Sequence, residues 1–385
     1  MQRRIHCVIM RGGTSRALFF RREDLPVDIA AQDRILLAAL GNPDPSGRLV
    51  NGLGGPISST SKVAIISARR GEPDTVDYTF GQGGHASTII DRGGNCGNIS
   101  SAVGPYAIDE GLVEVREPET RVRIYNTNTD KYIIAHVPTE GGKAKVAGDY
   151  RIAGVPGAGA PISLVFEAPG GTRTGRLLPT GRPQEILETA CGPIAVSIID
   201  AANPFVFVRA RDLGLAGTEL PDQLDADQEL VRRLEGIRAA AAIKIGLARD
   251  YREATERSPS VPKIALVSPA AGYRMTTGET IPVADVDLVA RMISLGRAHG
   301  AYPITGAVGT AGAAGIEGTL VREMIPRERL MRSTIRIGHP SGSVEVEAKF
   351  LIAGDQCEYL SAVVYRTARR LMDGHIYLPT DARLA

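Results

Sequence analysis

The chain has 385 residues, 43% hydrophobic and 23% charged, which is enough apolar material for one large core or, as we expect, two cores of ordinary size. This composition excludes disorder as the main state, and the scatter of 45 basic residues among 43 acidic ones excludes a nucleic-acid footprint. The partner that we expect is a small molecule.

The start, MQRRIHCVIMRGG, lacks an apolar core of signal-peptide length, and no stretch approaches about 18 uninterrupted apolar residues. Cys7, Cys96, Cys191 and Cys357 lie far apart without a CxxC pair, which argues against a zinc site, a redox motif or a disulfide framework. We therefore expect a cytoplasmic protein without a nucleic-acid or membrane partner. A homodimer is an open alternative to a monomer.

The first motif along the chain is MRGGTSR, from Met10 to Arg16. Its two glycines permit close approach of the backbone, and hydroxyl side chains follow them. The motif matches neither nucleotide-binding glycine pattern. We interpret it as an anion-binding loop with the candidate binding residues Arg11, Gly12, Gly13, Thr14 and Ser15.

The segment SSTSKVAIIS, which begins at Ser58, predicts a strand that starts at Lys62. If Lys62 points inward, desolvation and nearby cationic groups lower its pKa toward the working range of a base. In the alternative, the lysine reaches solvent from the strand end, as most lysines do. The preceding hydroxyls are either turn and cap residues or donors to a bound carboxylate: Ser59, Thr60 and Ser61.

The segment DRGGNCGNISSAVG predicts a helix that begins near Cys96. Free backbone N–H groups at a helix N-terminus form an anion site, and the same field favours a thiolate. In the alternative, Asn95 or Asn98 caps the helix and Cys96 fills a small apolar space. Both asparagines and Gly97 are candidate binding residues.

Residues 121–138, RVRIYNTNTDKYIIAHVP, alternate as two strands around NTNT, which has the composition of a hairpin turn. Asn128 in this turn is a further candidate binding residue. Equivalent turns of two repeated domains are expected to face one another across a cleft, although the turn interpretation alone explains most of these residues.

The second half of the chain repeats the order of the first. FFRREDL from Phe19 aligns with FVRARDL from Phe207, and KVAIIS from Lys62 aligns with KIALVS from Lys263. The series continues with ISSAVG and ITGAVG, RIYNTNT and RIGHPSG, and LPT twice. The offset drifts smoothly from 188 residues (Phe19 to Phe207) to 213 (Arg123 to Arg336), as surface-loop insertions would cause.

The repeat predicts an α+β fold of two similar domains, each with β-rich segments around one helix, and a ligand site in the cleft between them. The proline and glycine of LPTGRPQE place the boundary after a first copy of residues 1–184, which carries Lys62 and Cys96. Residues 185–385 form the second copy. Within it, residues 365–379 are interpreted as a helix and a strand that return to the first domain.

The alignment places Ala301 opposite Cys96, so the chain has one thiol at this position and not two. A symmetric pair of thiols serves racemisation, whereas an unpaired thiol suits one-sided proton movement. We interpret Lys263 as a carboxylate clamp, with a relic of duplication and a second base as alternatives. The remaining candidate binding residues of the second copy are His299, His339 and Ser341.

Together, MRGGTSR, SSTSKVAII, GGNCGNISSAVGPYAI, NTNT and GHPSG resemble the motifs of the PrpF-like family, over nearly the whole chain. This family contains 2-methylaconitate cis-trans isomerase, 3-methylitaconate Δ-isomerase and 4-oxalomesaconate tautomerase. The resemblance implies the diaminopimelate-epimerase-like fold, two domains in which a β-sheet or barrel wraps around a central helix. It also implies cofactor-free allylic isomerisation of an unsaturated tricarboxylic acid, with Lys62 and Cys96 as the catalytic residues. At Arg16 the chain departs from the family, which often has lysine there.

Two other functions stay open at this stage. One is amino-acid epimerisation on the same fold, which normally needs two opposed thiols. The other is a non-catalytic carboxylate-binding accessory protein to an aconitase-like dehydratase. The expected di- or tricarboxylate chemistry requires no cofactor, and no spacing of His, Asp and Glu indicates a metal.

Overall fold

The computed structural model describes residues 2–84, 86–353 and 356–379, which form two compact units. Unit 1 comprises the chain up to Leu164 and again from Tyr365, and unit 2 comprises Val165–Val364. The expected boundary near residue 184 lies inside unit 2. Backbone N–H groups of Arg173 and Thr174 both donate to Oδ2 of Asp200 at 2.8 Å, which attaches the segment before residue 184 to unit 2.

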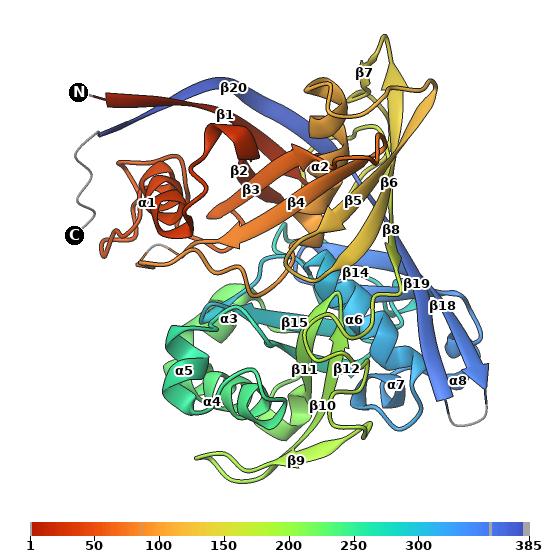
Figure 1. Ribbon diagram of the computed structural model, residues 1–385. Helices are drawn as coiled ribbons and strands as arrows, with labels where there is room; N and C mark the ends of the chain where they lie inside the picture. The colour runs from red at the N-terminus through yellow and green to blue at the C-terminus, as the bar shows by residue number, and fades with distance from the viewer. Residues whose placement is uncertain (1, 85, 354–355, 380–385) are drawn as a thin grey trace. The chain divides into compact units, whose positions relative to one another are not determined.

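Unit 1 contains a mixed β-sheet with the strand order β20-β1-β2-β3-β4-β5-β6, and both β7 and β8 pair with β6 (Figure 1). The β2–β3 and β4–β5 pairs are parallel, whereas β1–β2, β3–β4 and β5–β6 are antiparallel. The strands are β1 (Gln2–Gly12), β2 (Ser15–Arg21), β3 (Lys62–Ala68), β4 (Thr75–Gln82), β5 (Glu119–Asn126), β6 (Lys131–Glu140), β7 (Lys143–Ala144), β8 (Ile162–Glu167) and β20 (Ala368–Pro379). The helices are η1 (Arg22–Asp24), α1 (Ile29–Leu40) and α2 (Gly97–Asp109).

The apolar run in β2 is continuous because both faces of the strand are buried. Leu18 and Phe20 pack in one cluster with apolar residues of α1. Phe19 points to the other face, where its ring centre lies 5.2 Å from that of Tyr106 in α2. Every residue of α2 from Gly97 to Ile108 is buried, so this helix is the centre of unit 1.

Unit 2 has the same kind of sheet around a second buried helix, α6, whose residues 304–314 are all buried. Its strands are β9 (Glu185–Leu187), β10 (Ile194–Ala201), β11 (Asn203–Arg209), β12 (Lys263–Pro269), β13 (Tyr273–Arg274), β14 (Thr280–Ile281), β15 (Leu288–Ser294), β16 (Arg297–Ala298), β17 (Thr334–His339), β18 (Gly342–Ala353) and β19 (Gln356–Arg366), whose last two residues belong to unit 1. The helices are η2 (Ala210–Leu213), α3 (Pro221–Ala226), α4 (Gln228–Lys244), α5 (Tyr251–Glu256), η3 (Val283–Asp285), α6 (Ile304–Gly315), α7 (Leu320–Glu323) and α8 (Arg327–Leu330).

The two units repeat one topology. In unit 2, the strands β10, β11, β12, β15, β17 and β18 pair in the same sequence of antiparallel and parallel ladders as β1 to β6 in unit 1. Lys62 and Lys263 are the first residues of the equivalent strands β3 and β12. This agreement confirms the duplicated α+β fold that the sequence predicted.

The segment from residue 365 to 379 contains no helix, so that part of the prediction was wrong. β20 extends from Ala368 to Pro379 and pairs antiparallel with β1 along its length, beside it in Figure 1. Despite a shift of register between Ile9 and Met10, the ladder pairs each strand with one from the far end of the sequence, which overrides the local preference of ARRLMDG for a helix.

Candidate active site

The motifs that the sequence analysis identified in unit 1 lie at one end of its sheet. The parallel and antiparallel order of the ladders brings the β1–β2 turn, the start of β3 and the ends of β4 and β5 to this end. Strand register places Lys62 opposite Gln82, and the N–H of Arg16 donates to the carbonyl of Ser59 at 2.9 Å. The first turn of α2 packs against Gly12 at the same end.

Lys62 points inward, with 6% of its surface exposed. Its Nζ donates to Oε1 of Gln82 and lies 5.2 Å from the centre of the Phe80 ring. Burial lowers the pKa of the Lys62 ammonium, and the charge of a Cys96 thiolate opposes that shift. Among the described residues, no carboxylate pairs with this amine. The environment favours the neutral amine, which is the form that a general base needs.

Gln82, the last residue of β4, is a candidate site residue that the sequence analysis missed. Its Nε2 donates to the carbonyls of Ser61 at 2.8 Å and Gly83 at 2.7 Å. These bonds fix the amide so that Oε1 faces Lys62. A neutral acceptor holds the amine without the increase in pKa that a carboxylate would cause. Gln82 is recognised only from the register between β3 and β4, which pairs it with Lys62. A single sequence does not show that register.

Cys96 is the N-cap residue of α2, where the sequence placed it, and 8% of its surface is exposed. Its carbonyl accepts hydrogen bonds from N and Oγ of Ser100 at 2.9 and 3.1 Å. The Cys96 side chain makes no capping hydrogen bond. Oδ1 of Asn98 has no hydrogen-bond partner among the described residues, so Asn98 does not cap the helix, whereas Oδ1 of Asn95 accepts from Nδ2 of Asn126 at 3.1 Å. The N–H groups of the first turn of α2 lie beside Cys96, at the positive end of the helix dipole.

The NTNT segment is the turn between β5 and β6, which confirms the predicted hairpin. Oδ1 of Asn126 accepts from the N–H groups of Asn128 and Thr129, both at 3.1 Å. The Asn128 amide pairs with the backbone of Phe80, with Oδ1 accepting at 2.8 Å and Nδ2 donating at 2.9 Å. Asn128 thus holds the turn against β4, and its binding to substrate stays a prediction.

The MRGGTSR turn approaches α2 as its glycines predicted. A Cβ on Gly12 would come well within 3.0 Å of the carbonyl oxygen of Asn98, and one on Gly13, at φ +50°, would come as close to Oδ1 of Asn98. Nδ2 of Asn98 donates to Oγ1 of Thr14 at 3.1 Å, and Nη1 of Arg11 donates to the carbonyl of Gly13 at 3.0 Å. Glycine is therefore required for the contact between this turn and the helix start.

The hydroxyls of Thr60 and Ser61, before Lys62, have different surroundings. Oγ1 of Thr60 donates to the carbonyl of Ile57 at 3.2 Å, which is the behaviour of a turn residue. Ser61 is fully buried, and its hydroxyl has no hydrogen-bond partner among the described residues; its binding to a ligand stays a prediction. Ser15 and Gly97 are buried at the starts of β2 and α2.

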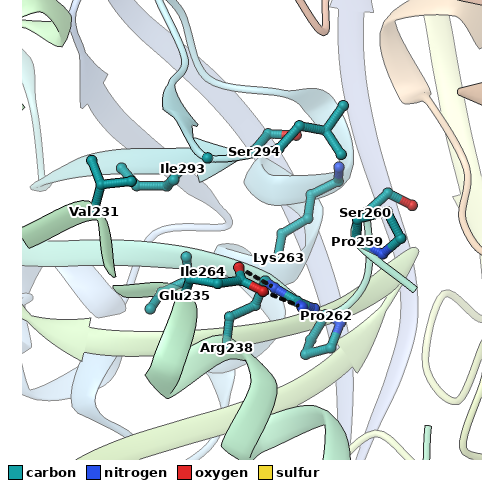
Figure 2. Close-up of a pocket in the computed structure, with 12 residues that line it drawn as sticks. Val231, Glu235, Arg238, Pro259, Ser260, Pro262, Lys263, Ile264, Ile293 and Ser294 are labelled. Carbon is teal, nitrogen blue, oxygen red and sulfur yellow. Dashed lines mark hydrogen bonds and ion pairs between the residues drawn. The ribbon is translucent and has the colours of Figure 1, made fainter. Parts of the chain in front are cut away.

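In unit 2, Lys263 starts β12 but has different neighbours from its counterpart in β3. It is half-buried, and the register of β12 with β15 places Ser294 opposite, where unit 1 has Gln82. Figure 2 shows Lys263 in a small pocket, its side chain extending away from the Glu235–Arg238 ion pair. Unit 2 has kept the lysine but not the amide that holds it.

The other predicted residues of unit 2 lie around the start of α6. Nδ1 of His299 lies 3.1 Å from the backbone N of Ala301, the residue aligned with Cys96. Oγ of Ser341 donates to the carbonyl of Gly300, and the N–H of Ser341 donates to Nδ1 of His339 at 3.3 Å. The structure therefore brings the HPSG turn to the segment before α6, as it brings the NTNT turn to the segment before α2.

A family model described as PrpF protein matches residues 2–379. The chain belongs to the PrpF protein family. It is 44% identical to the 3-methylitaconate isomerase of Eubacterium barkeri over 98% of both chains. It is 37% identical to the 2-methyl-aconitate isomerase of Shewanella oneidensis over 98% of both, and 39% identical to the (4E)-oxalomesaconate Delta-isomerase of a Novosphingobium species over 97% of both.

Solved structures agree with the PrpF assignment. The crystal structure of methylitaconate-delta-isomerase matches with a TM-score of 0.77 at 44% identity, over 98% of this chain and 96% of that one. A probable proline racemase from Agrobacterium radiobacter shares the fold, with a TM-score of 0.55 at 13% identity over 98% and 94%. The predicted family, the epimerase-like fold and the isomerase class are confirmed. No helix in the described part of the chain is long and apolar enough to span a membrane.

Proposed function

We propose that this PrpF family protein moves a double bond of an unsaturated tricarboxylic acid by a cofactor-independent 1,3-proton shift. The observation that carries the proposal is the environment of Lys62, a buried amine held by the neutral acceptor of Gln82 and within electrostatic range of Cys96. The relatives are named for unsaturated carboxylic acids, which supports a substrate of that class.

In the proposed reaction, neutral Lys62 takes a proton from the carbon next to the double bond. The remaining electron pair spreads over the double bond and a carboxylate as a dienolate, and the N–H groups at the start of α2 stabilise this charge. Cys96 returns a proton at the far end of the three-carbon unit, which shifts the double bond by one position. The Lys62 ammonium then reprotonates the thiolate and closes the cycle.

Proton NMR in heavy water tests this proposal with oxalomesaconate, methylaconitate and methylitaconate as substrates. We expect solvent deuterium at the allylic carbon with the wild type, and a loss of turnover of about 10²- to 10⁴-fold in Lys62→Ala with an unchanged circular dichroism spectrum. Lys145→Ala is the control, since Lys145 is an exposed lysine paired with Glu140. Full activity in Lys62→Ala would refute the assignment.

Two alternatives are tested by the same measurements. Amino-acid epimerisation is disfavoured because Ala301 stands where a second thiol would be needed, and exchange of the α-proton of a free amino acid would revive it. Tight binding of a tricarboxylate without exchange would favour the accessory protein. A cytoplasmic location and a homodimer remain predictions from the sequence.

A further inference from the structure

Arg366, in unit 1, is a buried cation without a carboxylate partner among the described residues. It is 7% exposed, its Nη1 donates to the carbonyl of Tyr365 at 2.8 Å, and its Nε has no hydrogen-bond partner within the described chain. Burial lowers the pKa of the guanidinium to about 10, so the group stays charged at neutral pH. A buried charge is unfavourable unless a counter-ion is supplied, and a ligand can supply it.

The position of Arg366 is fixed beside the turn between β1 and β2. The N–H of Gly13 donates to the carbonyl of Thr367 at 3.0 Å, and a Cβ on Gly13 would lie 3.2 Å from Cδ of Arg366. A Cβ on Gly13 would also come within 3.0 Å of Oδ1 of Asn98. This oxygen is buried without a hydrogen-bond partner in the described structure. Two buried polar side chains with unused hydrogen-bonding atoms therefore meet at Gly13, next to the start of α2.

Arg291 in unit 2 is a second buried arginine, with more backbone acceptors around it than Arg366 has. It is 1% exposed, but its Nε donates to the carbonyl of Glu219 at 2.7 Å and its Nη1 to that of Ala290 at 3.0 Å. Its guanidinium also lies 4.9 Å from the centre of the Tyr273 ring. Arg366 has the carbonyl of Tyr365 as its hydrogen-bond acceptor in the described structure and an electrostatic interaction with Tyr150. One nitrogen of each guanidinium, Nε of Arg366 and Nη2 of Arg291, is buried without a hydrogen-bond partner among the described residues.

The geometry points to Arg366 as the residue that binds one carboxylate of the substrate, at the Gly13 turn and the start of α2. This inference rests on the proposed function, from which it takes the carboxylate substrate. A guanidinium can donate two parallel hydrogen bonds to a carboxylate. Arg366 fixes the substrate, whereas Lys62 and Cys96 move the proton.

Kinetics and isothermal titration calorimetry on Arg366→Gln and Arg366→Lys test the assignment, with propane-1,2,3-tricarboxylate as a probe that cannot react. We expect KM and the Kd of the probe to rise about 100-fold in Arg366→Gln and less in Arg366→Lys, with kcat changed by less than about fivefold. Arg291→Gln is the matched control: it also removes a buried arginine, and we expect it to lower stability without changing the Kd of the probe.

An unchanged Kd in folded Arg366→Gln would overturn the inference, and so would a wild type that does not bind the probe. If the wild type binds the probe but exchanges no deuterium into any substrate, the proposed function is contradicted. The role of Arg366 is then still tested by the Kd of the probe for Arg366→Gln. If Arg366→Gln does not fold, NMR of the arginine Nε–H groups of the wild type decides. We expect one signal to shift on saturation with the probe, and no shifted arginine signal would overturn the inference.

Discussion

Burial of the Lys62 amine lowers the stability of the protein to an extent that depends on pH. The pKa of Lys62 is lowered in the folded state, so between that pKa and the ordinary value of 10.5 the unfolded chain binds more protons than the folded one. In this pH range the contribution of Lys62 to the free energy of unfolding therefore rises with pH. We expect Lys62→Met to be more stable than the wild type by about 1 to 3 kcal/mol near neutral pH. Urea unfolding should show this difference shrinking as the pH approaches 10.5. A difference that does not vary with pH would contradict the direction of the shift.

Gln82 gives the Lys62 amine a neutral acceptor, and burial is the main cause of its lowered pKa. In Gln82→Glu, a carboxylate beside the amine raises the pKa of Lys62, so we expect the acid limb of the pH profile of kcat/KM to move upward by about 1 to 3 units. Gln82→Leu removes the acceptor of the Lys62 amine. It should lower kcat at every pH without moving the acid limb of the kcat/KM profile to higher pH. If both variants keep the wild-type pH profile, Gln82 does not position the base.

At the scale of elements, the β1–β2 turn packs on α2 only because Gly12 has no side chain. A Cβ there would meet backbone atoms of Asn98, which cannot move without shifting the helix start, so we expect Gly12→Ala to lower the free energy of unfolding by about 1 to 3 kcal/mol. Gly236→Ala in α4 is the control, since a Cβ at Gly236 meets nothing within 4 Å. The control should gain about 0.5 to 1 kcal/mol in urea unfolding. Equal stability of the two variants would contradict this account.

Elements marked by the repeat were predictable, including the strands that start at Lys62 and Lys263 and the helix that follows Cys96. The elements and contacts that were not predicted depend on pairing between residues that lie far apart in the sequence. β20 is a strand because β1, from the other end of the sequence, completes its ladder. Gln82 and Arg366 were missed for the same reason: register and the return of the chain bring them to the site, and no local motif surrounds them.

At the scale of the whole molecule, duplication has left two copies of one topology with different polar interiors. Asp74 precedes β4 and Asp287 precedes β15, at the same offset of 213 residues that separates Arg123 from Arg336. The side chain of Asp74 is 45% exposed, whereas that of Asp287 is 2% exposed. Equivalent carboxylates of the two units therefore contribute differently to stability.

Asp287 joins two arginines inside unit 2. Its Oδ1 accepts from Nη1 of Arg329 at 2.8 Å and Nη2 of Arg336 at 3.0 Å, and its Oδ2 accepts from the N–H of Arg336 at 2.8 Å. Burial raises the pKa of this carboxyl, but the hydrogen bonds and charges of the arginines outweigh burial and lower the net pKa below its usual 3.8.

We expect Asp287→Asn to lower the free energy of unfolding by about 3 to 5 kcal/mol at neutral pH, because it leaves Arg329 and Arg336 without their shared counter-ion. Asp74→Asn, at the equivalent exposed position, should change it by less than about 0.5 kcal/mol. Because the pKa of Asp287 is lowered by folding, its contribution is complete above pH 3.8 and is lost as the pH falls through the folded-state value, so the two variants should converge in acid. Urea unfolding followed by circular dichroism measures both variants across this range. Equal losses at neutral pH would show that the buried network contributes no more to unit 2 than a surface carboxylate contributes to unit 1.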